Sequence, residues 1–195
     1  SNGYKYAAVF VDKATKTIWL YGLKRKGDYP PHIAKVDALI KADGASLGLR
    51  VLHGDGEFDS GATKDALTAI GAKLLVTAPD TPAANGQAEN AIGTISPDMR
   101  AILFAARLPK RFWFVAARFA RAIYDCSYHS TIKMSPYEAR TGMVPNLKYL
   151  HTFGATAFVH NPRSIRRRDK SAPTATKGIF IGYAGDEISP RMTVL

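Results

Sequence analysis

Asp55 and Glu89 are acidic residues whose sequence surroundings are typical of a divalent-cation site. Asp55 follows a short apolar run at 49–52 and lies in the glycine-rich turn 53–58, and Glu89 stands 34 positions later. Mg²⁺ and Mn²⁺ take hard oxygen ligands, and such ions can activate an attacking oxygen and stabilise a leaving one. The pair therefore points to phosphoryl transfer, which depends mainly on positioning and charge. The alternative is that both are solvated surface acids.

The stretch 77–90, with the sequence TAPDTPAANGQAEN, presents Glu89 at a fixed place. Its two prolines lack backbone donors and restrict the residues before them, which predicts a stiff, extended loop. Its Asn-Gly pair is typical of a turn, and a helix is predicted to begin near Gln87. Glu89 would then lie in the first helical turn, where the helix dipole favours a carboxylate. On this stretch alone, an acid at a helix start without chemistry is an equal alternative.

The surrounding pattern predicts the elements that position these acids. Strands are predicted at 6–11, 17–23, 49–52, 73–76, 156–160 and 177–183. Helices are predicted from just after Pro31 to about 44, at 62–70, at 87–106, from about Phe112 to Tyr124, and from Pro136. Pro97 predicts a break or kink inside the third helix. An opening hairpin followed by alternating strands and helices favours an α/β fold with a mixed sheet flanked by helices. We expect residues 1–150 to form this domain and residues 151–195 a small β unit.

The charge of the chain is its most informative bulk property. The 195 residues carry a formal net charge of +11, which indicates a polyanionic partner. Residues 1–90 hold 11 Lys and Arg against 10 Asp and Glu, whereas residues 91–195 hold 16 against 6. The single Cys126 excludes an internal disulfide and a cysteine-based zinc site, and it is compatible with a reducing compartment. No run of eighteen or more apolar residues is present, so we expect no membrane span.

The order of sequence landmarks resembles the integrase catalytic core of copia-type LTR retrotransposons, within the ribonuclease-H-like, retroviral integrase superfamily. The most specific pieces are the segment 77–89, the Phe-Gly pair at 153–154 and the segment GIFIGY at 178–183. Further matching pieces lie in the same order at 3–12, 19–23, 52–58, 108–113, 134–138, 142–145 and 150–154. The resemblance covers nearly the whole chain.

This resemblance implies a triad of two aspartates and one glutamate that binds Mg²⁺ and joins element DNA to target DNA. Glu89 matches the glutamate of the triad. Asp55 is the best match to the second aspartate; His53 is the alternative, because the turn is slightly shorter than in the family. In the family the first aspartate lies upstream of the segment matched by 3–6, so we expect it outside this chain. Asp12 matches a different aspartate and is the remaining candidate for a third ligand.

The resemblance also implies residues that contact DNA. The segment from about Phe153 is similar to the small Src-homology-3-like β-barrel that follows copia integrase cores, and its basic loop would contact phosphates. The expected DNA-binding residues are Asn85, Gln87, Arg163, Arg166, Arg167, Arg168 and Lys170. A homo-oligomer in the full-length protein is also implied, as is a location in the nucleus or in a cytoplasmic virus-like particle.

The leading interpretation is a fragment of a retrotransposon integrase, whose reaction is Mg²⁺-dependent strand transfer. Whether this chain is itself an enzyme stays open, since the first aspartate is expected outside it. The alternative is a non-catalytic, nucleic-acid-binding remnant of a decayed retroelement. A ribonuclease-H-type nuclease would share the sheet and the acids, but it would not explain the motifs at 153–154 and 178–183.

Overall fold

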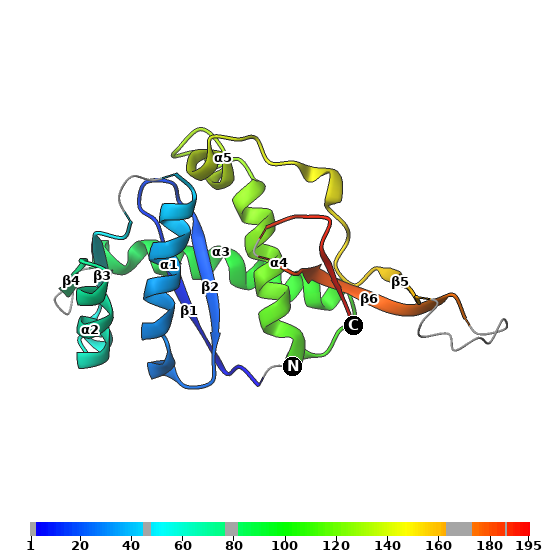
Figure 1. Ribbon diagram of the computed structural model, residues 1–195, viewed down its shortest axis with the longest axis horizontal. Coiled ribbons are helices and arrows are strands. Elements are labelled where there is room, and N and C mark those ends of the chain that lie inside the picture. The colour runs from blue at the N-terminus through cyan, green and yellow to red at the C-terminus, as the bar shows by residue number, and fades with distance from the viewer. Residues whose placement is uncertain (1–2, 45–47, 77–81, 163–172, 186) are drawn as a thin grey trace. The chain divides into compact units, whose positions relative to one another are not determined.

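The computed structural model describes residues 3–44, 48–76, 82–162, 173–185 and 187–195, without the side chains of residues 82–85 (Figure 1). The chain divides into two compact units. Unit 1 comprises Ser1–Ser96 and Tyr124–Pro145, and unit 2 comprises Pro97–Ile123 and Asn146–Leu195. The predicted division into 1–150 and 151–195 stays a prediction. Within the described residues, no helix is both long and apolar enough to cross a membrane.

Unit 1 begins with the predicted hairpin. Strands β1 (Tyr6–Val11) and β2 (Ile18–Leu23) pair antiparallel, with Phe10 opposite Trp19. Helix α1 (Pro30–Ala42) follows the short 3₁₀ turn η1 (Lys26–Asp28) and lies along the hairpin in Figure 1. The two prolines that open α1 fit there, because the first helical residues need no backbone donor.

The second part of unit 1 is a parallel strand pair joined through a helix. Strand β3 (Val51–Gly54) pairs with β4 (Lys73–Val76), and α2 (Gly61–Ala69) connects them. The strand predicted at 49–52 begins later than expected, because the backbone N–H of Leu49 donates to Asp37 of α1 at 2.9 Å. The two strand pairs form separate two-stranded sheets.

One apolar core holds the two strand pairs and the two helices together. Phe10 and Trp19 of the hairpin, Ile33 of α1 and Leu67 of α2 are buried in it, and Leu52 of β3 packs against it. Burial of such side chains contributes roughly 1.5–3 kcal/mol each to folding. The structure thus confirms a mixed α/β arrangement with helices against the strands.

Helix α3 runs without interruption from Pro82 to Ala105, which bears on two local predictions. The turn predicted at Asn85-Gly86 is wrong, since both residues lie inside α3. Pro82 opens the helix at a position where a missing donor costs nothing, and alanines follow it. A helix break at Pro97 is also wrong, because α3 continues through this residue, whereas the alternative of a kink there stays a prediction. The division between the two units falls at this proline.

Helix α4 (Trp113–Cys126) follows the 3₁₀ turn η3 (Lys110–Phe112) and extends into unit 1, where α5 (Pro136–Thr141) completes that unit. The predicted serine cap of α5 is confirmed, because Ser135 Oγ accepts from the N–H of Glu138 at 3.1 Å.

Unit 2 contains a three-stranded antiparallel sheet in the order β5-β6-β7, preceded by the 3₁₀ turn η4 (Leu147–Tyr149). The strands are β5 (Thr156–His160), β6 (Ala175–Tyr183) and β7 (Met192–Val194), of which the last was not predicted. Its core joins α3 and α4 to this sheet through Leu103, Phe119, Phe153 and Phe180.

The packing of unit 2 explains why phenylalanine and glycine occupy positions 153 and 154. Phe153 fills the core of unit 2, with its ring 5.3 Å from that of Phe119. Gly154 has φ +84°, and a Cβ there would lie 2.5 Å from the Cβ of Ala106. Only glycine allows both this backbone conformation and this close approach.

Candidate functional site

Asp55 is the first residue after β3, at the end where the parallel pair β3–β4 terminates. Its Oδ1 accepts a hydrogen bond from the N–H of Glu57 at 3.0 Å, which caps the 3₁₀ turn η2 (Gly56–Phe58). The side chain is half-buried. Side chains at the carboxyl ends of parallel strands are a common place for ligand contacts in α/β folds. The structure therefore holds Asp55 in one orientation at such an end, with Oδ2 making no hydrogen bond to the described residues.

The turn that carries Asp55 is anchored to α1 and α2. The ring of Phe58 packs on Tyr29 with centroids 4.8 Å apart, and a Cβ at Gly54 would lie 2.8 Å from the Phe58 ring. The hydroxyl of Tyr29 is 2.6 Å from Thr63 Oγ1, which in turn is 2.8 Å from Ser60 Oγ. Sequence reasoning missed this hydroxyl network, although a serine just before a helix is a typical cap.

His53, the alternative to Asp55, lies inside β3 opposite Leu75 and is exposed. The neighbouring Val51 and Leu75 on the same strand pair are also exposed, at 38% and 51%. His53 therefore belongs to the solvent-facing side of a strand, whereas Asp55 belongs to a capped turn. The choice between them as a metal ligand stays a prediction.

Glu89 is exposed on α3, and no acidic residue occupies the first turn of that helix. The expected place of Glu89 in the first turn is therefore wrong, because α3 begins at Pro82. The helix dipole therefore does not favour a carboxylate at Glu89, since its field acts mainly within one turn of the helix terminus. Gln87 is half-buried on the same helix, and the side chain of Asn85 lies outside the described residues.

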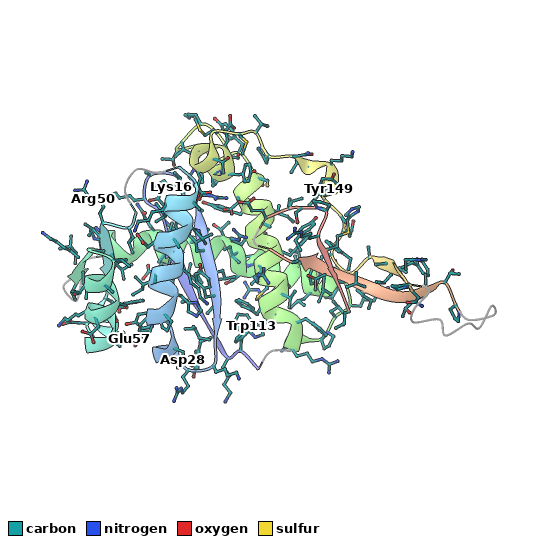
Figure 2. The ribbon with its side chains drawn as sticks, in the orientation of Figure 1. Lys16, Asp28, Arg50, Glu57, Trp113 and Tyr149 are labelled. Atoms are coloured by element: carbon teal, nitrogen blue, oxygen red, sulfur yellow. The ribbon has the colours of Figure 1, made fainter. Side chains whose placement is uncertain are left out.

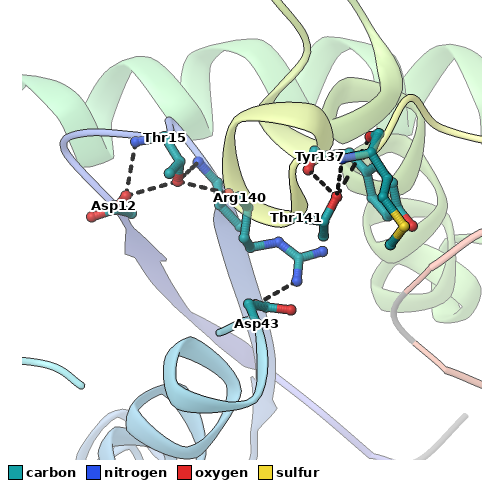
Figure 3. Close-up of polar contacts among 8 residues, drawn as sticks. Asp12, Thr15, Asp43, Tyr137, Arg140 and Thr141 are labelled. Carbon is teal, nitrogen blue, oxygen red and sulfur yellow. Dashed lines mark hydrogen bonds and ion pairs between the residues drawn. The ribbon is translucent and has the colours of Figure 1, made fainter. Parts of the chain in front are cut away.

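Asp12 closes the β1–β2 hairpin. Its Oδ2 accepts from the backbone N–H of Thr15 at 2.8 Å and from Thr15 Oγ1 at 2.7 Å (Figure 3). Lys16 in the same turn has φ +62°, a conformation that such side-chain bonds help to hold. The structure thus gives Asp12 a turn-forming role; a further role as a metal ligand stays a prediction.

The three predicted acids all lie in unit 1 but are not gathered into one site. Among the described residues, no group of three or more His, Cys, Asp or Glu side chains is placed to hold a metal ion. Asp12 and Asp55 follow strands that belong to separate sheets. The carboxylates have the right donor chemistry for Mg²⁺, but the three do not form a three-ligand cluster in the part of the chain that the structure describes.

Positive charge is concentrated in unit 2. By sequence, unit 1 holds 13 Lys and Arg against 12 Asp and Glu, whereas unit 2 holds 14 against 4. Five of the basic residues of unit 2 are the predicted phosphate contacts Arg163, Arg166, Arg167, Arg168 and Lys170, which lie outside the described residues. The excess of ten positive charges makes unit 2 the part of the chain suited to a polyanion.

Curated relatives match almost the whole chain. A retrovirus-related Pol polyprotein from the transposon TNT 1-94 of Nicotiana tabacum is 32% identical over 195 residues, which is 97% of this chain and 14% of that protein. The corresponding protein of the transposon RE2 of Arabidopsis thaliana is 27% identical over 94% of this chain and 12% of its own length. The chain thus spans about one-seventh of the length of these relatives. No family model matches it.

Solved structures show the same fold at low sequence identity. The catalytic core domain of HTLV-2 integrase, in complex with magnesium and in a trimeric form, superposes with a TM-score of 0.51 at 16% identity, over 72% of this chain and 88% of that one. A chain of the simian T-cell lymphotropic virus intasome gives a TM-score of 0.53 at 13% identity, over 99% of this chain and 72% of that one. The chain is therefore homologous to a segment of the retrovirus-related Pol polyproteins of copia-type plant transposons, and it has the ribonuclease-H-like fold of retroviral integrase catalytic cores.

Proposed function

We propose that this chain is the integrase-core part of a retrotransposon Pol polyprotein and serves DNA strand transfer. The observation that carries the proposal is the 32% identity to a transposon Pol polyprotein over 97% of the chain. The fold shared with an integrase core solved with magnesium gives further support. The proposal includes DNA and further copies of the chain as partners, and action in the nucleus or in a virus-like particle.

The proposed reaction exchanges one phosphodiester for another. The 3′-hydroxyl oxygen of element DNA attacks a phosphorus atom of target DNA and forms a new P–O bond, while the bond from that phosphorus to the target 3′-oxygen breaks. The hydroxyl proton is lost, and the target 3′-oxygen gains one. A divalent cation, when bound, would supply positive charge for the attacking and leaving oxygens. In this proposal Asp55 and Glu89 would hold that cation.

The half-buried turn at Asp55 supports its part in the proposal. The Glu57 N–H fixes Oδ1, and the Tyr29–Thr63–Ser60 network fixes the turn below it. A carboxylate held in this way loses little rotamer freedom on binding a cation, which is the benefit of preorganisation. Glu89 is exposed and thus accessible to such an ion.

A strand-transfer assay tests this proposal. A labelled duplex with a free 3′-hydroxyl is incubated with plasmid DNA and Mn²⁺, and joined product is measured for the wild-type chain, Glu89→Gln and Glu57→Gln. Glu57, labelled in Figure 2, is a matched control because it is an exposed acid 3.7 Å from Lys26 in the same unit. We expect joining by the wild type and Glu57→Gln and none by Glu89→Gln; equal joining by all three would refute the role of Glu89.

The alternative function is binding of nucleic acid without chemistry. The observation that favours it is the absence of a three-ligand metal cluster among the described side chains. Duplex binding by a wild-type chain that shows no joining under any divalent cation would establish this alternative.

A further inference from the structure

Phe104 of α3 is the most exposed of the large apolar side chains described, at 87%. It lies in unit 2, where the neighbouring Leu103 is buried in the core and the Phe104 ring is exposed to solvent. An exposed aromatic side chain of this size contributes nothing to the core, and its ring face is accessible for stacking on a ligand.

Exposed cations surround this ring. Arg100 stands four residues before Phe104 within α3, which places these two on one side of the helix, and Arg107 lies just beyond the last helical residue, Ala105. Lys110 follows in the next turn and is also exposed. None of these three cations forms an ion pair with the described residues. With a rise of about 1.5 Å per residue, Arg100 lies roughly one helical turn before the ring.

The backbone at Arg107 supports a binding role for this side chain. The N–H of Leu108 donates to the carbonyl of Leu103 at 3.1 Å, and that of Arg107 donates to Phe104 at 3.1 Å, which is the Schellman pattern that ends a helix. Arg107 occupies the left-handed position of this motif with φ +52°, where glycine is usual. An arginine there costs about 1 kcal/mol, and such cost is often found at functional positions.

We propose that Arg100, Phe104, Arg107 and Lys110, named here the α3 patch, bind single-stranded nucleic acid. A base stacks on the ring of Phe104, and the cations contact the phosphates on either side of it; stacking of this kind accepts any base. The excess of ten positive charges in unit 2 argues against a second copy of the same surface as the occupant and favours a polyanion. The patch rests on the proposed function only for the class of its ligand, a nucleic acid. It does not involve the acid site, since it uses neither Asp55 nor Glu89.

Fluorescence anisotropy with a labelled oligonucleotide tests the patch. The probe is a mixed-sequence DNA single strand, compared with its duplex, and EDTA is present so that the result does not depend on the acid site. We expect Phe104→Ala to weaken single-strand binding about fivefold to a hundredfold and duplex binding less than twofold. Phe104→Trp should keep the affinity, and its fluorescence should fall on binding.

Arg107→Gly separates a binding role from a structural one. Glycine removes the cation and relieves the left-handed backbone, so we expect weaker binding to both strands and a melting temperature equal to or above that of the wild type. The slope of log affinity against log salt should fall by about 0.7 for the single strand. Tyr128→Ala and Lys35→Ala in unit 1 are matched controls for an exposed aromatic and an exposed cation, and we expect both to bind like the wild type.

Two outcomes would overturn the proposal. One is unchanged single-strand affinity in Phe104→Ala with a wild-type melting temperature. The other is displacement of the probe by poly-glutamate of equal charge as efficiently as by the unlabelled oligonucleotide, which would assign the surface to an acidic protein segment. Equal strand transfer by the wild type and Glu89→Gln would refute the role of Glu89, and the expected loss of single-strand binding by Phe104→Ala in EDTA would still support the patch, so the two proposals fail separately.

Discussion

Removing the carboxylate of Asp43 should destabilise unit 1 by about 2–4 kcal/mol. Asp43 caps the end of α1, and its Oδ2 lies 2.6 Å from an Nη of Arg140 in α5, which ties two segments 97 positions apart (Figure 3). Both side chains are largely buried, with 19% and 11% exposed. Breaking a fully buried pair costs about 3–5 kcal/mol. Two effects lower the expected cost: the pair is not fully buried, and the substitution removes an acid from a helix C-terminus, where negative charge is unfavourable.

A second ion pair of equal length provides the control. Lys64 and Asp59 also approach to 2.6 Å, but they remain 59% and 44% exposed. Such a surface pair contributes at most about 1 kcal/mol, so Asp59→Ala should cost little. Urea unfolding is followed by the fluorescence of Trp19, which is buried in unit 1, in a Trp113→Phe background that silences unit 2. Equal costs for Asp43→Ala and Asp59→Ala would refute the reasoning that burial, rather than distance, sets the energy.

Three further substitutions test local features of unit 1. Gly93→Ala should stabilise the chain by about 0.5–1 kcal/mol, because the residue lies inside α3 and an added Cβ meets nothing within 4 Å; a lower melting temperature would contradict this. Ser60→Ala should cost about 1–2 kcal/mol in urea unfolding, since it removes the cap of α2 and a partner of the hydroxyl network; a cost near zero would show that the cap is dispensable. Burial of His32, with a smaller effect of Lys35, lowers the pKa of the imidazole below 6.5, so the unfolded chain binds the proton more tightly. Stability should therefore fall as the pH drops below 6.5, and the urea midpoint of His32→Phe should lose this dependence; an unchanged dependence would assign it to other groups.

The strands and most helices were predictable because local patterns decide them. The hairpin, β4 and β5 follow from short apolar and β-branched runs bounded by turn residues. Strand β7 carries only Met192, Thr193 and Val194, too short a run to stand out; its pairing with β6 decides it. Local signals also misled about a turn at Asn85-Gly86 and about a break at Pro97, because a long helix with good helix formers on both sides accommodates glycine and proline.

The site was predictable in part. The turn at Asp55 follows from its glycines, but the network of Tyr29, Thr63 and Ser60 that anchors it joins residues far apart in the sequence. The place of Glu89 within α3 depended on where the helix begins, which is the least certain feature of a sequence pattern. The α3 patch could not be foreseen, because the exposure of Phe104 depends on which face of α3 the core of unit 2 takes up.

Calorimetric titration of Mn²⁺ into the full chain tests the central claim, that Asp55 and Glu89 form an acid site for a divalent cation. The titration is made on the wild type, Glu89→Gln, Asp55→Asn and the control Glu57→Gln, with folding checked by circular dichroism. We expect binding heat from the wild type and from Glu57→Gln and none from Glu89→Gln or Asp55→Asn. Absence of heat from a folded wild-type chain, or the same heat from Glu89→Gln, would contradict the claim and leave nucleic-acid binding as the activity of this chain.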